Sequence, residues 1–251
     1  MATSPVIYFN EARFELLKLS RNRSFLFSMI GFPVIFYLLF GVVYKNTVFQ
    51  GQTIARYLLA GYSCFGAMGS SLFGIGAWLA AERGYGWLEM KRASPMPAAA
   101  YLLAKLSVSI TFAVGIALLL MTLGTALAGV HITTFEGLRL LAVIALGVVP
   151  FASLGLIIGL VMPSNATPGV INLIYLPMSF CGGLWMPIES LPHWLQVIAH
   201  GLPSFWLSRL ALRSLGYSNS SPVIAWALLA GYTVLFLSAA AFIFRRQEAQ
   251  A

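Results

Sequence analysis

The sequence ERGYGWLEMKRASPMP, residues 82–97, separates two long apolar stretches and decides how the rest of the chain is interpreted. It contains two of the seven acidic residues and three of the fifteen basic residues. Residues 57–81 before it and residues 101–128 after it carry almost no charge. Because a charged segment between two such stretches is costly in hydrocarbon, we expect it at one membrane face, where a partner protein can reach it.

The composition indicates that most of the chain is solvated by lipid. Of its 251 residues, 59% are hydrophobic and 9% are charged, whereas soluble domains carry about 25% charged residues. All seven acids are Glu, which excludes chemistry that needs an Asp pair or an Asp nucleophile. Both cysteines lie in apolar stretches and predict neither a disulfide nor a metal site. We attribute the formal charge of +8 to the loops and expect no nucleic-acid partner.

Six apolar stretches are candidates to cross a bilayer, which needs about 20 residues per helix. They are residues 25–44, 57–81, 101–128, 139–162, 169–185 and 223–244. No polar insert of domain size separates them, so we expect one all-α integral membrane domain over residues 1–251. Residues 186–222 alternate prolines with short apolar helical pieces, which predicts a re-entrant or interfacial helical hairpin between the fifth and sixth spans.

The N-terminal segment, residues 5–24, has the pattern of an amphipathic helix. Glu11, Glu15 and Lys18 recur on one face, and apolar residues occupy the other. A helix of this kind just before a span is expected to lie along the membrane surface. A second expectation concerns Lys105, which lies near the start of the third stretch and should extend its ammonium group to the interface.

A stripe of small residues follows one face of the second stretch at spacings of three and four. Its members include Ser63, Gly66, Ser70 and Gly74. Small side chains let helix backbones approach closely in lipid. The stripe therefore predicts either a seam with a second chain or close packing within this one.

A polar stripe follows the fifth stretch with the same periodicity. It consists of Asn172, Tyr175 and Ser179. Polar groups inside a span face protein or water rather than lipid. We therefore expect these residues to line a substrate path or to hydrogen-bond a neighbouring helix.

The distribution of Lys and Arg predicts the orientation. With the N-terminus inside, ten of the fifteen basic residues fall on the inner side and five on the outer side. Both termini and residues 82–97 are then cytoplasmic, and residues 186–222 are external.

Three groups of residues carry a resemblance to a known family. The first is Gly31-Phe32-Pro33, in the span that follows the N-terminal helix. The second, in the charged loop, is Glu82-Arg83, Gly84 or Gly86, Leu88-Glu89 and Ser94-Pro95. The third, in the proline-rich segment, is Gly183, Pro187, Leu191-Pro192, Trp194-Leu195, Pro203 and Arg213. In this order they resemble the permease subunit of ATP-binding-cassette exporters of the second bacterial class, which includes drug, polysaccharide and lipid-linked export systems. The loop departs from the family pattern, because Gly-Tyr-Gly-Trp stands where Glu-x-Gly-Thr is common.

The resemblance implies a permease of a bacterial cytoplasmic membrane, with a cytoplasmic coupling helix between spans two and three. In such exporters two permease chains, identical or paralogous, pair above two ATPase subunits. This chain has no G-x-x-x-x-G-K-[ST] loop, so ATP and Mg²⁺ are expected on the partner, with no cofactor and no enzyme activity here. The expected ATPase-coupling residues are Glu82, Arg83, Trp87, Leu88 and Glu89. The expected cargo is an amphipathic drug-like molecule, a lipid or a glycan.

Other functions were weighed against this one. An ion- or proton-coupled transporter would carry ionisable residues at mid-membrane, but every acid lies away from the span centres. A membrane anchor for a cytoplasmic partner would not need the polar stripe of the fifth stretch. An intramembrane serine protease needs a Ser and a His facing each other, and the three histidines lie outside the apolar stretches.

Overall fold

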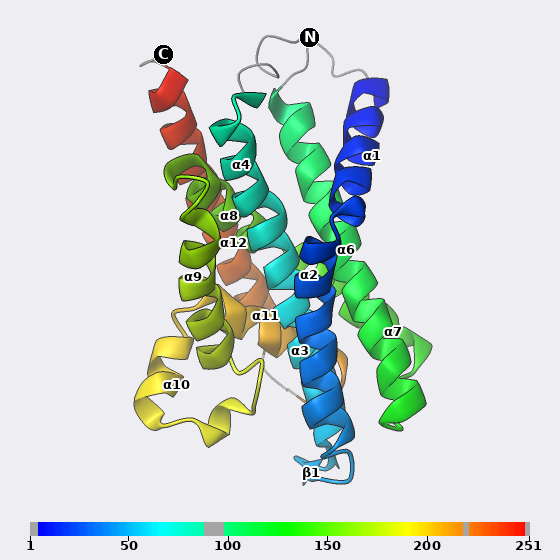
Figure 1. The fold of residues 1–251 in the computed structure, drawn as a ribbon. Coiled ribbons are helices and arrows are strands. Elements are labelled where there is room, and N and C mark those ends of the chain that lie inside the picture. The colour runs from blue at the N-terminus through cyan, green and yellow to red at the C-terminus, as the bar shows by residue number, and fades with distance from the viewer. Residues whose placement is uncertain (1–4, 88–97, 218–220, 249–251) are drawn as a thin grey trace.

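A computed structural model describes residues 5–87, 98–217 and 221–248. In this part of the chain the helices form an elongated bundle (Figure 1). The elements are α1 (Pro5–Arg21), α2 (Arg23–Phe36), the π-helical η1 (Tyr37–Val42), β1 (Val48–Phe49), β2 (Gln52–Thr53), α3 (Ile54–Ser71), the π-helical η2 (Leu72–Ala77), α4 (Trp78–Gly84), α6 (Ala98–Leu127), α7 (Thr134–Gly147), α8 (Val149–Val161), α9 (Thr167–Cys181), the 3₁₀ turn η3 (Ile188–Ser190), α10 (His193–Ala199), α11 (Pro203–Ser214) and α12 (Pro222–Glu248). The short strands β1 and β2 pair antiparallel in a hairpin.

The chain is a multi-pass membrane protein. Within the described residues five helical segments are long and apolar enough to span a bilayer: Arg23–Val42, Ile54–Gly84, Tyr101–Leu127, Thr134–Val161 and Pro222–Arg246. The predicted fifth span is different, because α9 has 15 residues and a length of roughly 22 Å, less than a hydrocarbon core of about 30 Å. The turn that follows α9 has Gly183 at φ +73°. Six spans therefore stay a prediction.

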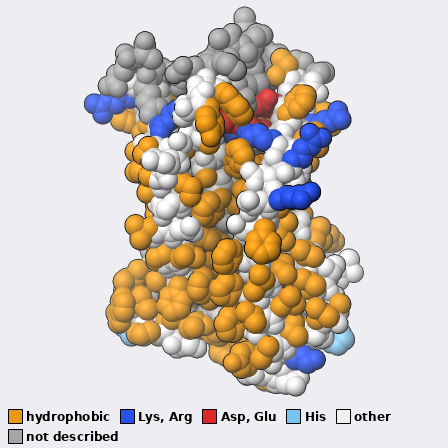
Figure 2. Space-filling model, viewed as in Figure 1, with side chains coloured by type: hydrophobic (Ala, Val, Ile, Leu, Met, Phe, Trp, Pro, Cys, Tyr) orange, Lys and Arg blue, Asp and Glu red, His pale blue; other side chains and the backbone are white. Residues whose placement is uncertain are grey.

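The two ends of the bundle differ in composition. The termini and the end of α4 lie at one end, and the β-hairpin and α10 lie at the other (Figure 1). Most of the Lys and Arg side chains visible on one face gather near the termini, while apolar side chains cover the middle and the opposite half (Figure 2). This is the charge asymmetry from which the orientation was predicted.

Helix α1 turns its charged face toward protein, contrary to the expectation for a helix resting on a membrane surface. Glu15 is 3% exposed, whereas Phe9 and Phe14 are 68% and 66% exposed. Tyr8 on α1 also shares a hydrogen bond with Ser107 on α6. The physical reason is that Glu15 and Lys18 find opposite charges on α4 and α6. The apolar side chains of α1 are thereby left for lipid or for another protein.

The stripe of small residues on the second span lies inside this chain. Ser63, Gly66, Ser70 and Gly74 are all buried. A Cβ atom added at Gly66 would lie 2.6 Å from Cγ2 of Ile116 on α6. The stripe is therefore a close-packing surface of α3 and η2, and its buried residues leave no open face for a second chain.

Within the proline-rich segment, α11 packs into the bundle, whereas α10 keeps Trp194 and Val197 exposed. Leu207 and Ala211 of α11 are fully buried, and α11 lies near the centre of the half that is remote from the termini (Figure 1). Arg56 of α3 connects α3 to α7, to the loop before α7 and to the end of α11. It pairs with Glu136 of α7 and donates hydrogen bonds to the carbonyls of His131 (2.9 Å) and Leu215 (3.1 Å).

Candidate functional site

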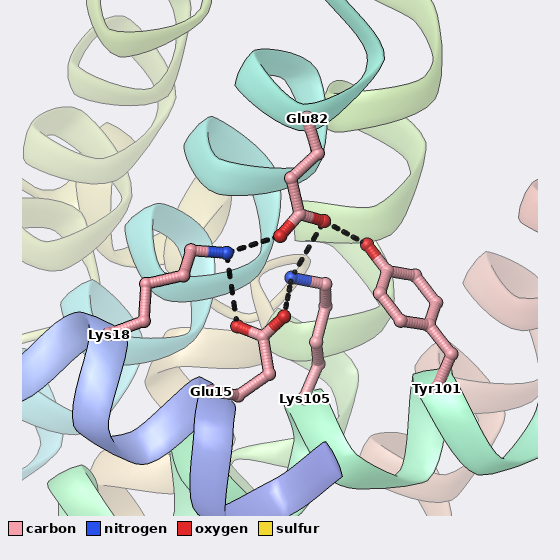
Figure 3. A network of polar contacts seen from close by, with 5 residues as sticks. All are labelled: Glu15, Lys18, Glu82, Tyr101 and Lys105. Atoms are coloured by element: carbon pink, nitrogen blue, oxygen red, sulfur yellow. Dashed lines mark hydrogen bonds and ion pairs between the residues drawn. The ribbon is translucent and has the colours of Figure 1, made fainter. Parts of the chain in front are cut away.

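Five polar side chains from three helices meet at the end of α4 that lies near the termini (Figure 3). Glu15 and Lys18 come from α1, Glu82 comes from α4, and Tyr101 and Lys105 come from α6. We call these five residues the charge network. Its members are up to 90 positions apart in sequence, so only the folded chain brings them together.

The charges in the network alternate in sign. The Lys105 ammonium lies 3.1 Å from Oε1 of Glu15 and 3.2 Å from Oε2 of Glu82. Lys18 lies 3.4 Å from Oε2 of Glu15 and pairs with Oε1 of Glu82. The Tyr101 hydroxyl donates a hydrogen bond to Oε2 of Glu82. Each carboxylate is thus matched by both ammonium groups, and the formal charge of the cluster is zero.

The network is buried except at Lys18, whose side chain is 25% exposed. Lys105 is 2% exposed and Glu82 is 1% exposed. Lys18 and Lys105 also lie 4.8 Å and 4.9 Å from the ring centroids of Trp78 and Tyr101, a cation–π geometry. The expectation that Lys105 extends to the interface is therefore wrong. A buried ammonium needs opposite charges nearby, and Glu15 and Glu82 supply them inside the protein.

Arg83, the residue after Glu82, binds a different neighbour. Its guanidinium donates hydrogen bonds to the carbonyls of Leu160 and Met162 at the end of α8. Carbonyls in the last turn of a helix have no partner within the helix, and a cation is favourable there. Glu82 thus joins α4 to α1 and α6, while Arg83 joins α4 to α8.

Beyond Arg83 the chain presents two exposed aromatic side chains. Helix α4 ends at Gly84, and Gly86 has φ +71°, a conformation that favours glycine. Tyr85 and Trp87 are 74% and 46% exposed, with ring centroids 5.8 Å apart. The helix that carries Glu82 therefore ends before this turn.

Two of the predicted coupling residues, Leu88 and Glu89, lie outside the described residues. Arg83 lies in the last turn of α4, and Trp87 follows the turn after it. Glu82 is buried, so it cannot contact a partner directly in this conformation, and its contribution to coupling would act through the network.

The polar stripe of α9 does not form one open surface. Tyr175 is buried and its hydroxyl donates a 2.8 Å hydrogen bond to the Phe65 carbonyl on α3. Ser179 is also buried and bonds the Leu176 carbonyl of its own helix at 2.9 Å. Asn172 is exposed. Two of the three residues therefore serve helix packing in this chain.

The sequence interpretation missed the partners of Glu82. It placed Lys105 in the interface and Glu15 on a membrane surface, and it assigned no role to Tyr101. One signal was present: Lys105 stands alone among apolar residues in the third stretch. An ionisable residue inside a span normally has a partner within the protein, and a carboxylate is the natural partner for lysine.

Comparison with known proteins agrees with this architecture. The ABC-2 type transporter family matches residues 11–215, a region that includes the charge network, Arg83 and the exposed aromatic pair. The chain is also similar to "Putative transport permease YvfS" of Bacillus subtilis (strain 168), with 30% identity over 240 residues that cover 94% of this chain and 96% of the relative. The resemblance inferred from the motifs is confirmed, and the chain belongs to the ABC-2 type transporter family as a membrane permease subunit.

Proposed function

We propose that this chain is the membrane-spanning subunit of an ATP-driven exporter whose separate ATPase docks on Tyr85 and Trp87. The observation that carries the proposal is the exposure of this aromatic pair immediately after a helix end that is anchored on two sides. Aromatic side chains are enriched at protein interfaces because they bury a large apolar area while keeping a polar group available. Leu88 and Glu89, the next two residues in sequence, stay part of the proposed contact.

The anchored helix end supports a mechanical role. Glu82 ties α4 to α1 and α6, and Arg83 ties α4 to α8. A displacement imposed on Tyr85 and Trp87 would therefore move four helices together rather than bend one. A coupling element needs this property, because the closure of an ATPase changes the transport path only if the spans move with it.

The remaining parts of the proposal rest on membership of the family and on the distribution of Lys and Arg along the chain. Two permease chains, identical or paralogous, pair above two ATPase copies that hold ATP and Mg²⁺, and this chain acts as a single permease domain with no cofactor of its own. The protein lies in a bacterial cytoplasmic membrane with both termini in the cytoplasm and exports an amphipathic drug-like molecule, a lipid or a glycan. Of the three residues that were predicted to line the cargo path, we propose that Asn172 does so. Tyr175 and Ser179 would have to break their hydrogen bonds before they could contact cargo.

The docking proposal is tested with the double variant Tyr85→Ala/Trp87→Ala. Loss of an interface aromatic anchor typically costs about 2 kcal/mol or more, roughly 30-fold in affinity. We expect the tagged permease to insert normally but to recover much less of its ATPase on purification, with ATP-dependent transport lost to a similar extent. Trp194→Ala is the matched control, since Trp194 is equally apolar, 63% exposed and located at the opposite end.

Equal ATPase recovery in the double variant and the control would refute the docking surface. Transport by the wild-type protein that responds to a proton or sodium gradient but not to ATP would instead favour the ion-coupled alternative.

The topology is tested by cysteine labelling in intact cells with a membrane-impermeant maleimide. In a background with Cys181→Ser, we expect Lys45→Cys to react from outside and Tyr85→Cys to react only after permeabilisation. Both positions are exposed, and they lie at opposite ends of the second span. The reversed pattern would overturn the orientation, and the parent without either new cysteine measures any signal from the buried Cys64.

A further inference from the structure

A cavity of about 500 Å³ opens between α7, α11 and α12 in the half of the bundle that is remote from the termini. It is lined by Arg139, Ala142, Val143, Leu210, Arg213, Ser214, Gly216, Pro222 and Trp226. Its volume is within the range of small-molecule sites, about 300–1,000 Å³. It is separate from the charge network, which lies at the other end of the molecule.

The lining of the cavity is strongly asymmetric in charge. Among the described residues that line it are two guanidinium groups, from Arg139 and Arg213, and none of these described residues carries a carboxylate. The two acids on the neighbouring elements have other cations: Glu136 pairs with Arg56, and Glu189 lies 3.7 Å from Arg209. Two arginines that line one space favour an anion there, and phosphate matches the forked donor geometry of arginine.

Apart from Ser214 and Gly216, the other lining residues are apolar, and the apolar wall continues onto surfaces that face out of the bundle. Val143, Leu210 and Trp226 line the cavity, and next to it Leu138 and Val223 are 60% and 71% exposed. A membrane-spanning helix with such an exposed apolar surface faces lipid. A molecule that satisfies both parts of the site therefore has an anionic head and hydrocarbon chains. Trp226 suits the boundary, because tryptophan is enriched where membrane meets water.

We propose that this cavity binds the phosphate group of an anionic phospholipid, with Arg139 and Arg213 as its ligands and the acyl chains along α7 and α12. The start of α12 at Pro222 adds the positive end of a helix dipole to the same space. The assignment of the site to the outer leaflet rests on the proposed function, which sets the orientation. The binding chemistry itself does not depend on the ATPase or on transport.

The site is tested on the purified full chain in detergent, by native mass spectrometry with added phosphatidylglycerol or phosphatidylcholine. We expect retention of phosphatidylglycerol in preference to phosphatidylcholine. Arg139→Gln and Arg213→Gln should each weaken phosphatidylglycerol binding by about tenfold or more, as expected for loss of a charge-assisted contact. Lys45→Gln is the matched control, because it removes one exposed cation from the same half of the molecule outside the cavity.

A second experiment uses glycerol phosphate, which carries a phosphate ester like that of the phospholipid but no acyl chains. Competition by glycerol phosphate at millimolar concentration, lost in the arginine variants, would assign the site to a soluble phosphate ester and not to lipid. The proposal is overturned if wild type, Arg139→Gln and Arg213→Gln retain phosphatidylglycerol equally, or if phosphatidylcholine binds as well. Failure of the ATPase docking test leaves these results unaffected, so the two proposals fall separately.

Discussion

Lys105→Met is expected to lower the free energy of unfolding by about 3–5 kcal/mol, the typical cost of leaving a buried charge without its partner. The substitution removes one of the two ammonium groups that balance Glu15 and Glu82, while keeping a side chain of similar length. Two buried carboxylates would then share Lys18, the partly exposed member of the network. The measurement is the unfolding midpoint of the purified protein in detergent, followed by tryptophan fluorescence, together with the yield of folded protein.

Two further variants separate this effect from a general loss of charge. Glu189→Gln removes an exposed carboxylate 3.7 Å from Arg209 and should change the stability by about 0–1 kcal/mol. The double variant Glu82→Gln/Lys105→Met removes one charge of each sign and should recover a large part of the stability lost in Lys105→Met. A midpoint for Lys105→Met that matches that of Glu189→Gln would show that the network contributes little.

Gly61→Ala is expected to prevent stable folding, with a cost of about 3 kcal/mol or more. A Cβ atom at Gly61 would lie 2.1 Å from the carbonyl oxygen of Leu184 and 3.0 Å from its carbonyl carbon. Both are backbone atoms, so no side-chain rotation relieves the contact. The turn that carries Leu184 is itself held in place, because Tyr57 donates a 2.8 Å hydrogen bond to the Gly183 carbonyl. Yield and thermal unfolding in detergent are the measurements.

Gly231→Ala is the matched control for this substitution. Gly231 lies within α12, and a Cβ atom there would meet nothing within 4 Å. Since alanine is favoured over glycine in a helix by about 1 kcal/mol, this variant should be neutral or slightly stabilising. If Gly61→Ala unfolds at the same temperature as Gly231→Ala, α3 does not contact the turn after α9 as closely as described.

Local patterns in the sequence predicted the elements that depend on local chemistry. Apolar runs placed the second span at residues 57–81, and the structure has a helical segment from Ile54 to Gly84. Periodicity also identified the small-residue face that includes Gly66. What covers that face could not be predicted, because the contact with Ile116 joins positions far apart in the chain. Periodicity indicates which residues share a face and says nothing about the neighbour.

The candidate site shows the same limit more sharply. Glu82 was assigned to the charged segment that a partner protein can reach. In the structure it lies in the last turn of α4, and its side chain is buried. Its burial is tolerable only because Lys105 and Lys18 neutralise it, and neither pairing has a local signature. Trp87, one of the expected coupling residues, is 46% exposed, and its contact with a partner stays a prediction. The turn that presents it depends on Gly86 in a left-handed conformation, which the sequence alone did not indicate.

The order of synthesis has a consequence for how the charge network assembles. Glu15 leaves the ribosome 90 residues before Lys105, which at about 5–20 residues per second is an interval on the order of ten seconds. During this interval α1 has no α6 to pack against, so its charged face has to stay in water or among lipid headgroups. Lys18, 3.4 Å from Glu15 within the same helix, supplies a countercharge in the meantime. A nascent chain that stops before residue 105 would leave this end of the protein unassembled, with Glu15 lacking its partner on α6.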